Sequence, residues 1–221
     1  MSEENDKFPL HTAAREGNVL KAEGLLKADP KLSRKKDDDG RYPIHWAASS
    51  NNLEIVTLLA NQTSFDPDVQ DDSGWTPLMI SASVADSEAI LRVLIQKGAE
   101  VNEKSKLYQY ILIYVAMSKR LKLTASQTAL HFVASKKNMD VARLLLESKP
   151  PASTRFRDRR GQYPIHRAAA VGSVSMVSLL LQNKSPLNPT DNEGYTPLHH
   201  AIAEGHGSYT SPGWRICLTQ C

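Results

Sequence analysis

Apolar residues in this chain come in short groups at helical spacing, and the groups recur along the sequence. One kind of group contains runs of small residues, such as Ala47–Ala48 and Ala168–Ala170. The other kind has larger aliphatic residues three and four positions apart, such as Ile55 and Leu59. This spacing places apolar side chains on one face of a short helix. The pattern therefore predicts pairs of short helices, with small residues on the first helix of each pair.

A short motif precedes each pair. It consists of a small or polar turn, Gly, a variable residue, Thr or Tyr, Pro, an aliphatic residue, His, a variable residue and Ala. Its proline position is occupied by Pro9, Pro43, Pro77, Ala129, Pro164 and Pro197. The successive intervals are 34, 34, 52, 35 and 33 residues, so four of the five are close to one period.

Each part of the motif has a physical role at the start of a helix. Threonine before the proline accepts a hydrogen bond from a backbone N–H that has no partner inside the helix, and proline lacks that N–H. Glycine supplies the positive φ that the preceding turn requires. These roles fall on Thr76, Thr128 and Thr196 for capping, and on Gly40, Gly74, Gly161 and Gly194 for the turn.

The motif and its period resemble the ankyrin-repeat family. The resemblance implies an all-α solenoid in which each repeat is a β-turn followed by an antiparallel helix pair. A single pair cannot bury its apolar face, so the pairs must stack. The expected domain is 7–207, after an N-terminal tail at 1–6, with repeats near 7–39, 40–72, 73–105, 126–158, 160–192 and a partial sixth at 193–207.

The long interval contains an insertion at 106–124 that replaces the usual turn before Gln127. It has three of the seven tyrosines of the chain, an apolar half and a basic half. Three interpretations are open: a partner-binding loop, an insertion that bulges from the side of the turns, and an intron translated in frame.

The sixth repeat stops early, because Pro212-Gly213 breaks any second helix. An irregular tail is expected at 208–221. Without a polar capping helix, Leu198 and Ile202 are expected to be partly uncovered. Mis-splicing could explain both this truncation and the insertion.

Composition and charge narrow the class of protein. A formal charge of +3 is too small to indicate nucleic-acid or membrane binding. Cys217 and Cys221 are the only cysteines, which excludes a disulfide framework in the body of the chain and favours a reducing compartment. The polar start MSEENDKF predicts no secretory signal, and the apolar run 107–117 is too short to span a bilayer. We expect a soluble monomer.

The histidines and paired carboxylates are expected to be structural. Five of the seven histidines hold the same repeat position, where each is predicted to bond backbone within or between repeats: His11, His45, His131, His166 and His199. A metal site or hydrolase built on His200 and His206 is the alternative, but no ligand set completes it. Asp37–Asp39 and Asp71-Asp72 are interpreted as solvated turns. No phosphate loop or nucleophile elbow is present. No cofactor, metal or catalytic residue is predicted.

The residue types point to a protein partner. The grooved face of such a stack is formed by the turns, called fingers, and by the variable positions of the first helices. Early fingers are acidic and the later finger at 155–160 is basic, which suits a partner with complementary charge. Aromatic residues and arginine are enriched at interface hot spots. The candidates for partner binding are Arg41, Tyr42, Trp46, Trp75, Ile80, Phe132, Lys136, Arg167 and Tyr195.

Finer details resemble the gankyrin family of proteasome assembly chaperones. The matching stretches are 40–47 with 52–56, 74–78, 130–137 and 166–170. The resemblance implies binding to the C-terminal domain of an ATPase subunit in the base of the proteasome regulatory particle. It also implies a cytoplasmic and nuclear location, and basic contacts at Arg41 and Lys136. The stretch 199–204 has no cysteine, so a retinoblastoma-type partner is not implied. The alternative is a general ankyrin adaptor for signalling or transcription proteins.

Overall fold

The computed structural model describes residues 6–105 and 126–206. The predicted insertion at 106–124, the predicted tail at 208–221 with both cysteines, and residues 1–5 of the predicted N-terminal tail lie outside the described residues. All regular secondary structure in the described part is helical and no β-strand is present there, which confirms the predicted all-α class.

The chain divides into two compact units, residues 1–100 and 101–221. Unit 1 holds α1 Pro9–Glu16, α2 Val19–Ala28, the 3₁₀ helix η1 Pro30–Arg34, α3 Pro43–Ser49, α4 Leu53–Ala60, α5 Pro77–Ser83 and α6 Glu88–Gln96. Unit 2 holds α8 Ala129–Lys136, α9 Met139–Glu147, α10 Pro164–Ala170, α11 Val174–Gln182 and α12 Pro197–Ala203.

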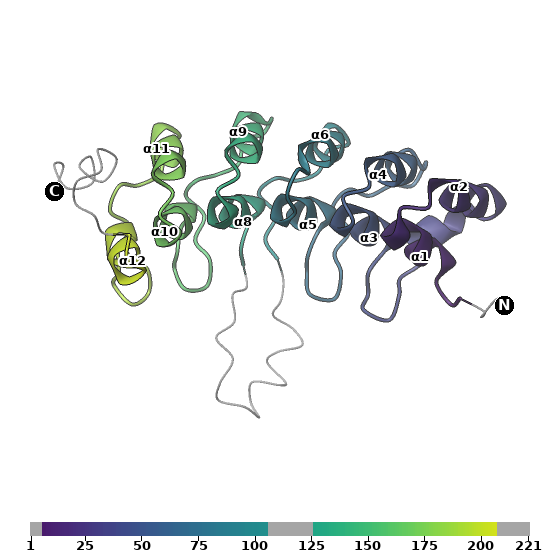
Figure 1. Ribbon diagram of the computed structural model, residues 1–221, viewed down its shortest axis with the longest axis horizontal. Helices are drawn as coiled ribbons and strands as arrows, with labels where there is room; N and C mark the ends of the chain where they lie inside the picture. Colours follow the sequence, from purple (N-terminus) through teal and green to yellow (C-terminus); the bar gives the residue numbers. More distant parts are fainter. Residues whose placement is uncertain (1–5, 106–125, 207–221) are drawn as a thin grey trace, which may run out of the picture. The chain divides into compact units, whose positions relative to one another are not determined.

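Within unit 1 the helices form two rows (Figure 1). The first helices α1, α3 and α5 pack side by side, and the second helices α2, α4 and α6 form the other row. Each second helix packs on the first helix of its own repeat. The loops that lead to α3 and α5 extend beyond the first row as fingers (Figure 1).

Unit 2 has the same design. The first helices α8, α10 and α12 pack in sequence, and α9 and α11 pack on α8 and α10. No second helix follows α12 within the described residues. Ile202 on α12 is accordingly 45% exposed, and Leu198 is half-buried, which agrees with the expected uncovered surface.

Small residues let the first helices approach one another. Ala47, Ala48, Ala168 and Ala169 are all fully buried. An alanine at these positions leaves room for the next helix, whereas a larger side chain would force the rows apart. The second helices fill the remaining space with larger side chains, of which Ile55, Val56, Leu59, Ile90, Leu91, Leu94, Val141, Leu145, Met176, Val177 and Leu180 are buried.

The finger turns have the conformation that the glycines predicted. Gly40, Gly74, Gly161 and Gly194 all have positive φ, between 68° and 84°. At Gly40 a Cβ atom would also collide with the Asp72 carboxylate of the next finger. Ser126, with φ of 71°, takes the place of glycine in the fourth repeat.

The two ends of the insertion meet at the base of a finger. The Ser105 N–H donates to the Gln127 carbonyl at 3.2 Å, and the Ser126 N–H donates to the Ser105 carbonyl at 3.2 Å. The insertion therefore leaves and re-enters the fold at one point.

None of the described helices has the length and apolar character needed to cross a membrane.

Deleting residues 106–123 is expected to raise the free energy of unfolding by about 2 kcal/mol. Ser105 and Ser126 already contact each other, and connecting them through Thr124-Ala125 leaves a finger as long as the one at 71–75. Loop-closure cost falls by about 0.6 kcal/mol for each halving of loop length. Urea denaturation of the deletion variant and the parent chain measures the difference.

Replacing residues 106–123 with a Gly/Ser linker of equal length is the matched control and should leave stability close to that of the parent. A deletion variant less stable than this control would show that the insertion contributes packing that the finger needs.

Candidate protein-binding site

A buried or half-buried aspartate closes each of four fingers. One carboxylate oxygen, Oδ1, accepts hydrogen bonds from the backbone N–H groups two and four residues further along, at 2.8–3.0 Å. These bonds satisfy N–H groups that the tight turn would otherwise leave without partners. The aspartates are Asp37, Asp71, Asp158 and Asp191.

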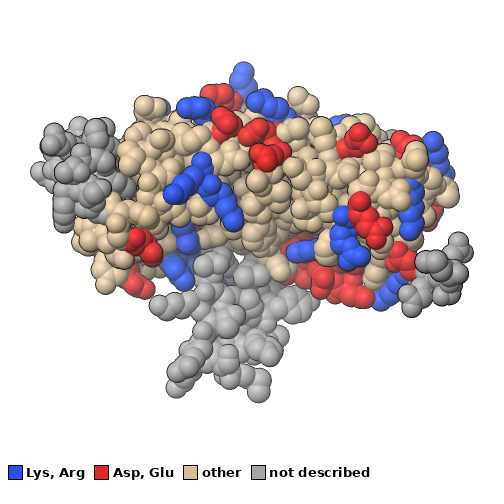
Figure 2. Space-filling view, in the orientation of Figure 1, with Lys and Arg blue, Asp and Glu red and all other residues tan. Residues whose placement is uncertain are grey.

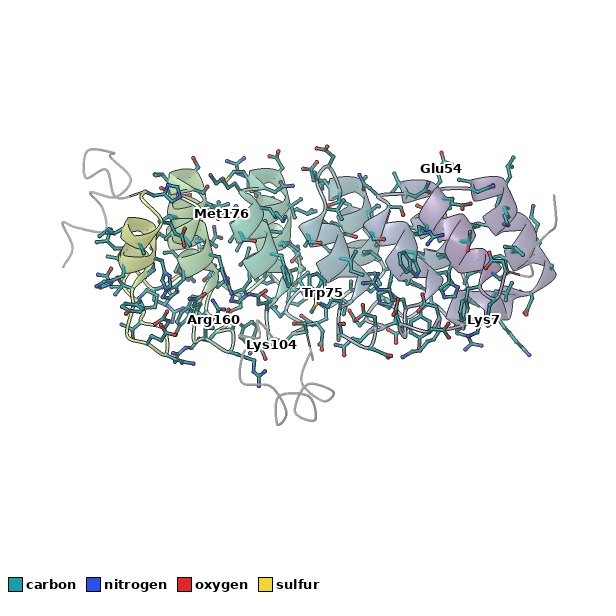
Figure 3. All side chains as sticks on the ribbon, turned by 60° about the horizontal axis from the view of Figure 1, so that its bottom comes forward. Lys7, Glu54, Trp75, Lys104, Arg160 and Met176 are labelled. Carbon is teal, nitrogen blue, oxygen red and sulfur yellow. The ribbon has the colours of Figure 1, made fainter. Side chains whose placement is uncertain are left out.

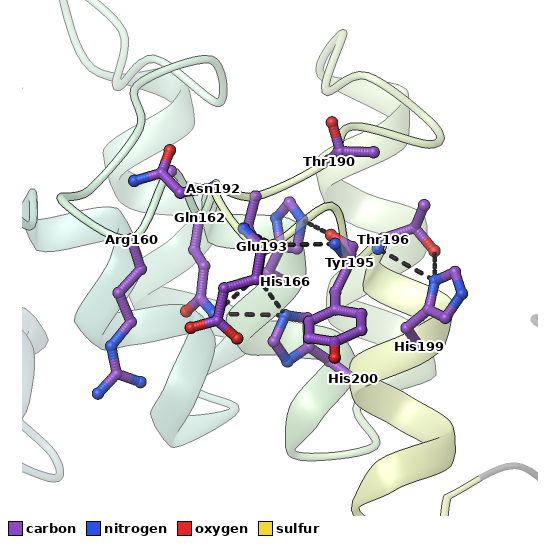
Figure 4. A network of polar contacts seen from close by, with 12 residues as sticks. Arg160, Gln162, His166, Thr190, Asn192, Glu193, Tyr195, Thr196, His199 and His200 are labelled. Carbon is purple, nitrogen blue, oxygen red and sulfur yellow. Dashed lines mark hydrogen bonds and ion pairs between the residues drawn. The ribbon is translucent and has the colours of Figure 1, made fainter.

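The second oxygen, Oδ2, ties the finger to the first helix of the same repeat. The donor is always nine residues further along the chain. Trp46 Nε1 donates to Asp37 at 2.7 Å, and Arg167 donates to Asp158 at 2.8 Å. His200 Nε2 lies 2.9 Å from Asp191 (Figure 4). Finger and helix are thus joined through one carboxylate.

The same oxygens also receive donors from the preceding repeat. Arg41 Nε donates to Asp71 at 3.3 Å in unit 1, where the residue nine positions along is the apolar Ile80. In unit 2, Gln127 donates to Asp158 and Gln162 donates to Asp191, each at 3.4 Å. Neighbouring fingers are therefore held in register.

The interpretation of Asp71 as a solvated finger residue is wrong. Asp71 is 6% exposed because two backbone N–H groups and Arg41 surround its carboxylate. Sequence reasoning also missed Asp158 and Asp191. The signal that could have found them is the spacing Asp-x-x-Gly, which recurs in all four fingers. The carboxylates that do gather at the finger ends of unit 1 include the exposed Asp38, Asp39 and Asp72 (Figure 2).

The repeat histidines bridge the repeats as predicted. In four of them Nδ1 accepts the N–H of the residue that precedes the helix, at 3.0–3.2 Å, so the neutral ring carries its proton on Nε2: His45, His131, His166 and His199. In His45, His131 and His166, Nε2 then donates to a carbonyl of the next finger, for example from His131 to Gln162 at 3.1 Å. His11 makes the same bond to the Arg41 carbonyl at 3.0 Å.

This bonding changes how the threonines cap the helices. Thr76 accepts from the Met79 N–H as predicted, because methionine replaces histidine there. Thr128 and Thr196 differ: their hydroxyls lie 3.0 and 2.8 Å from the histidine Nδ1 three residues further along. Each threonine and its histidine form a capping box, in which the threonine side chain faces the backbone N–H of the histidine and the histidine Nδ1 accepts the threonine N–H.

Burial sets the charge of these groups. Desolvation lowers the pKa of four repeat histidines, and lowers that of His131 to about 4: His11, His45, His131 and His166. Burial alone would raise the pKa of Asp191, but hydrogen bonds from His200 and from the Tyr195 N–H outweigh it and lower the pKa to about 2. Asp158 is likewise held charged by Arg167. Within residues 6–105 and 126–206, no three metal-ligating side chains cluster.

In unit 1 the predicted partner-binding residues come together around Trp46. Two guanidinium groups lie near its ring, that of Arg41 at 4.9 Å and that of Arg15 at 5.8 Å from the ring centre. Tyr42 is half-buried and stacks on His45 at 5.9 Å. A hollow of about 130 Å³ lies beside the Trp46 ring, with a lining of Asp6, Phe8, His11, Thr12, Arg15, Asp37 and Trp46.

Two other candidates of unit 1 are less accessible than expected. Ile80 is only 7% exposed, so the expectation that it lies open on the grooved face is wrong; the first-helix packing of α5 covers it. Trp75 is half-buried at the finger side of the unit (Figure 3).

In unit 2 the candidates vary in exposure. Lys136 is exposed at the end of α8, and Tyr195 is 47% exposed. Phe132 is half-buried. The Arg167 side chain is 21% exposed, and its ion pair with Asp158 gives it a structural role besides any role in binding.

The stacked turn–helix–helix units have a recognisable counterpart among known sequences. The ankyrin-repeat model, described as three copies, matches residues 10–105 and 130–210. The chain belongs to the ankyrin-repeat family. The ankyrin repeat domain of Bcl-3 has a TM-score of 0.73 at 23% identity, covering 98% of this chain and 87% of that one, a likeness that shows the fold.

Two relatives of this ankyrin-repeat protein are proteasome proteins. The probable 26S proteasome regulatory subunit p28 of Saccharomyces cerevisiae is 37% identical over 204 residues, which is 90% of this chain and 81% of that protein. The 26S proteasome non-ATPase regulatory subunit 10 of Dictyostelium discoideum is 34% identical over 84 residues, or 38% of this chain and 36% of that protein. The predicted gankyrin-like resemblance is confirmed, and a protein-interaction role follows from it.

Substituting Asp158→Asn is expected to lower the free energy of unfolding by about 2 kcal/mol. The substitution removes the charge that faces the half-buried Arg167 and leaves that guanidinium without its counter-ion. Chemical denaturation measures the loss. Asp140→Asn is the matched control, since its ion pair with Arg143 is exposed, and it should change stability by less than about 0.5 kcal/mol. Equal effects of the two substitutions would contradict the structural role of Asp158.

Lowering the pH from 6.5 to about 4 is expected to lower the free energy of unfolding. In this interval the unfolded chain takes up a proton at His131, whereas the folded chain does not, so stability rises with pH. Each unit of pKa difference corresponds to about 1.4 kcal/mol. Below about 4 the His131 contribution is constant, and protonation of Asp191 removes further stability as the pH falls from 3.8 toward about 2.

Urea denaturation across this pH interval measures the effect. A His131→Asn variant should be less stable at neutral pH, because it loses the bond to Gln162, but its stability should fall less steeply on acidification. An equally steep fall in the variant would assign the pH dependence to other groups.

Proposed function

We propose that this protein is a non-catalytic chaperone that binds the C-terminal domain of an ATPase subunit of the proteasome regulatory particle during assembly. The observation that carries the proposal is the similarity to the yeast regulatory subunit p28, which spans 90% of this chain. A protein with this role would act in the cytoplasm and the nucleus as a monomer. The alternative function is that of a general adaptor for signalling or transcription proteins.

The chemistry of the grooved face supports a protein ligand. In unit 1, Trp46 offers an amphipathic ring with two arginines close to it. In unit 2, Tyr195 and Lys136 present an aromatic ring and a flexible positive charge. Rigid aromatic residues next to cations are the combination that dominates binding energy at protein interfaces.

The histidines offer no support for catalysis. The bonds described above commit Nδ1 and Nε2 of His45, His131 and His166 to backbone groups. His200 lies against Gln162, His166 and Tyr195, and its Nε2 faces the Asp191 carboxylate, through which it is bonded to the finger.

Lys136→Glu is expected to weaken binding to the cognate ATPase C-terminal domain about tenfold, because it reverses an exposed charge on the grooved face. Pull-down of isolated ATPase C-terminal domains identifies the partner, and calorimetry then measures the affinity. Lys136 is a better probe than Arg41, whose reversal would also break the bond to Asp71.

Lys27→Glu is the matched control, because Lys27 lies on a second helix with its side chain 82% exposed, and it should leave affinity unchanged. If no ATPase C-terminal domain binds the folded chain, the proposed partner is wrong and the adaptor role is favoured.

A further inference from the structure

The fingers of unit 2 carry a group of cationic side chains that have no role in the binding site proposed above. We define the basic finger edge as Lys104, Arg155, Arg157 and Arg160. Lys104 and Arg160 both lie on the finger side of the unit (Figure 3). None of the four forms an ion pair with a carboxylate in the part of the chain that the structure describes.

The nearest aspartates of these fingers cannot neutralise this edge. The side chains of Asp158 and Asp191 are 0% and 3% exposed, and their oxygens are occupied by the turn, by Arg167 and by His200. The fold thus uses these two carboxylates internally, and the exposed Glu193 of the last finger forms no ion pair with the four cations in the described part of the chain.

Backbone carbonyls hold two of the arginines in place. Arg155 Nε donates to the Lys184 carbonyl at 3.0 Å. Arg157 donates through Nε to the Gly161 carbonyl at 3.2 Å, and through a terminal nitrogen to the Thr190 carbonyl at 3.4 Å. A carbonyl orients a guanidinium without cancelling its charge, and each guanidinium has further N–H groups to donate. Such preorganisation lowers the entropy that a partner must overcome on binding.

The aromatic rings of this edge are covered. The Lys104 ammonium lies 4.6 Å from the centre of the Phe156 ring. The Tyr163 ring has the Arg157 guanidinium at 5.7 Å and stacks on His166 at 5.9 Å. Single-stranded nucleic acids bind through bases stacked on open aromatic faces. The edge therefore suits carboxylates of a protein better than nucleic acid.

We propose that the basic finger edge binds an acidic segment of the protein partner. Carboxylates of that segment would pair with the outward N–H groups of Arg155, Arg157 and Arg160. The inference rests on the proposed function in that the edge would serve the same partner, and it deepens that function by naming the chemistry of the partner's contact surface.

Fluorescence anisotropy with a labelled oligoglutamate peptide tests the proposal on the full chain. The peptide is expected to bind at low salt and more weakly at physiological ionic strength. An Arg155→Gln, Arg160→Gln double variant should bind about tenfold more weakly. Arg143→Gln, which removes an exposed charge from the second helix α9, should bind like the parent. A thermal melt of each variant verifies folding.

Three results would overturn the proposal: no peptide binding by the folded parent chain, an equal loss in Arg143→Gln, or tighter binding of a single-stranded oligothymidylate of the same charge. Capture of ATPase C-terminal domains is measured in parallel. Peptide binding without capture of any ATPase domain would refute the proposed function alone. Undiminished capture by the double variant, without peptide binding, would refute the basic finger edge alone.

Discussion

The structure depends on carboxylates buried at the base of the fingers. A turn that must project from the helices has N–H groups that no helix can satisfy, and one aspartate oxygen accepts two of them in each case. The other oxygen is then bonded to the first helix or to the preceding finger, as at Asp158 with Arg167 and Gln127. A single side chain thereby shapes the finger, orients it and sets its register with its neighbour.

The buried histidines complete this arrangement from the helix side. His131 satisfies the N–H before its own helix and a carbonyl of the next finger, so its repeat is bonded to the one after it. Packing of alanines brings the first helices close enough for these bonds to form. Because burial keeps the histidines neutral, the bonds hold at neutral pH without any change of charge.

The bonds to the finger aspartates limit which side chains remain available to a partner. Arg41, Trp46 and Arg167 each contribute a bond to a finger aspartate, so their polar groups are partly committed to the fold. The side chains of Lys136, Tyr195 and the basic finger edge make no bond to a carboxylate within residues 6–105 and 126–206. The binding surface is therefore formed by side chains that take no part in the bonds within and between the repeats.

Periodicity alone determined the repeat architecture, because the spacing of Pro43, Pro77 and Pro164 and the turn glycines describe local structure that each repeat forms in the same way. The roles of the histidines also followed from their fixed place in the repeat. Only the tertiary structure showed that Asp71, Asp158 and Asp191 are buried, that Ile80 is covered and that Arg167 is paired. The Asp-x-x-Gly spacing marks the aspartates locally, but the bonds that Arg41, Gln127 and Gln162 make to the aspartate of the next finger join residues about one repeat apart, and a local pattern does not record such contacts.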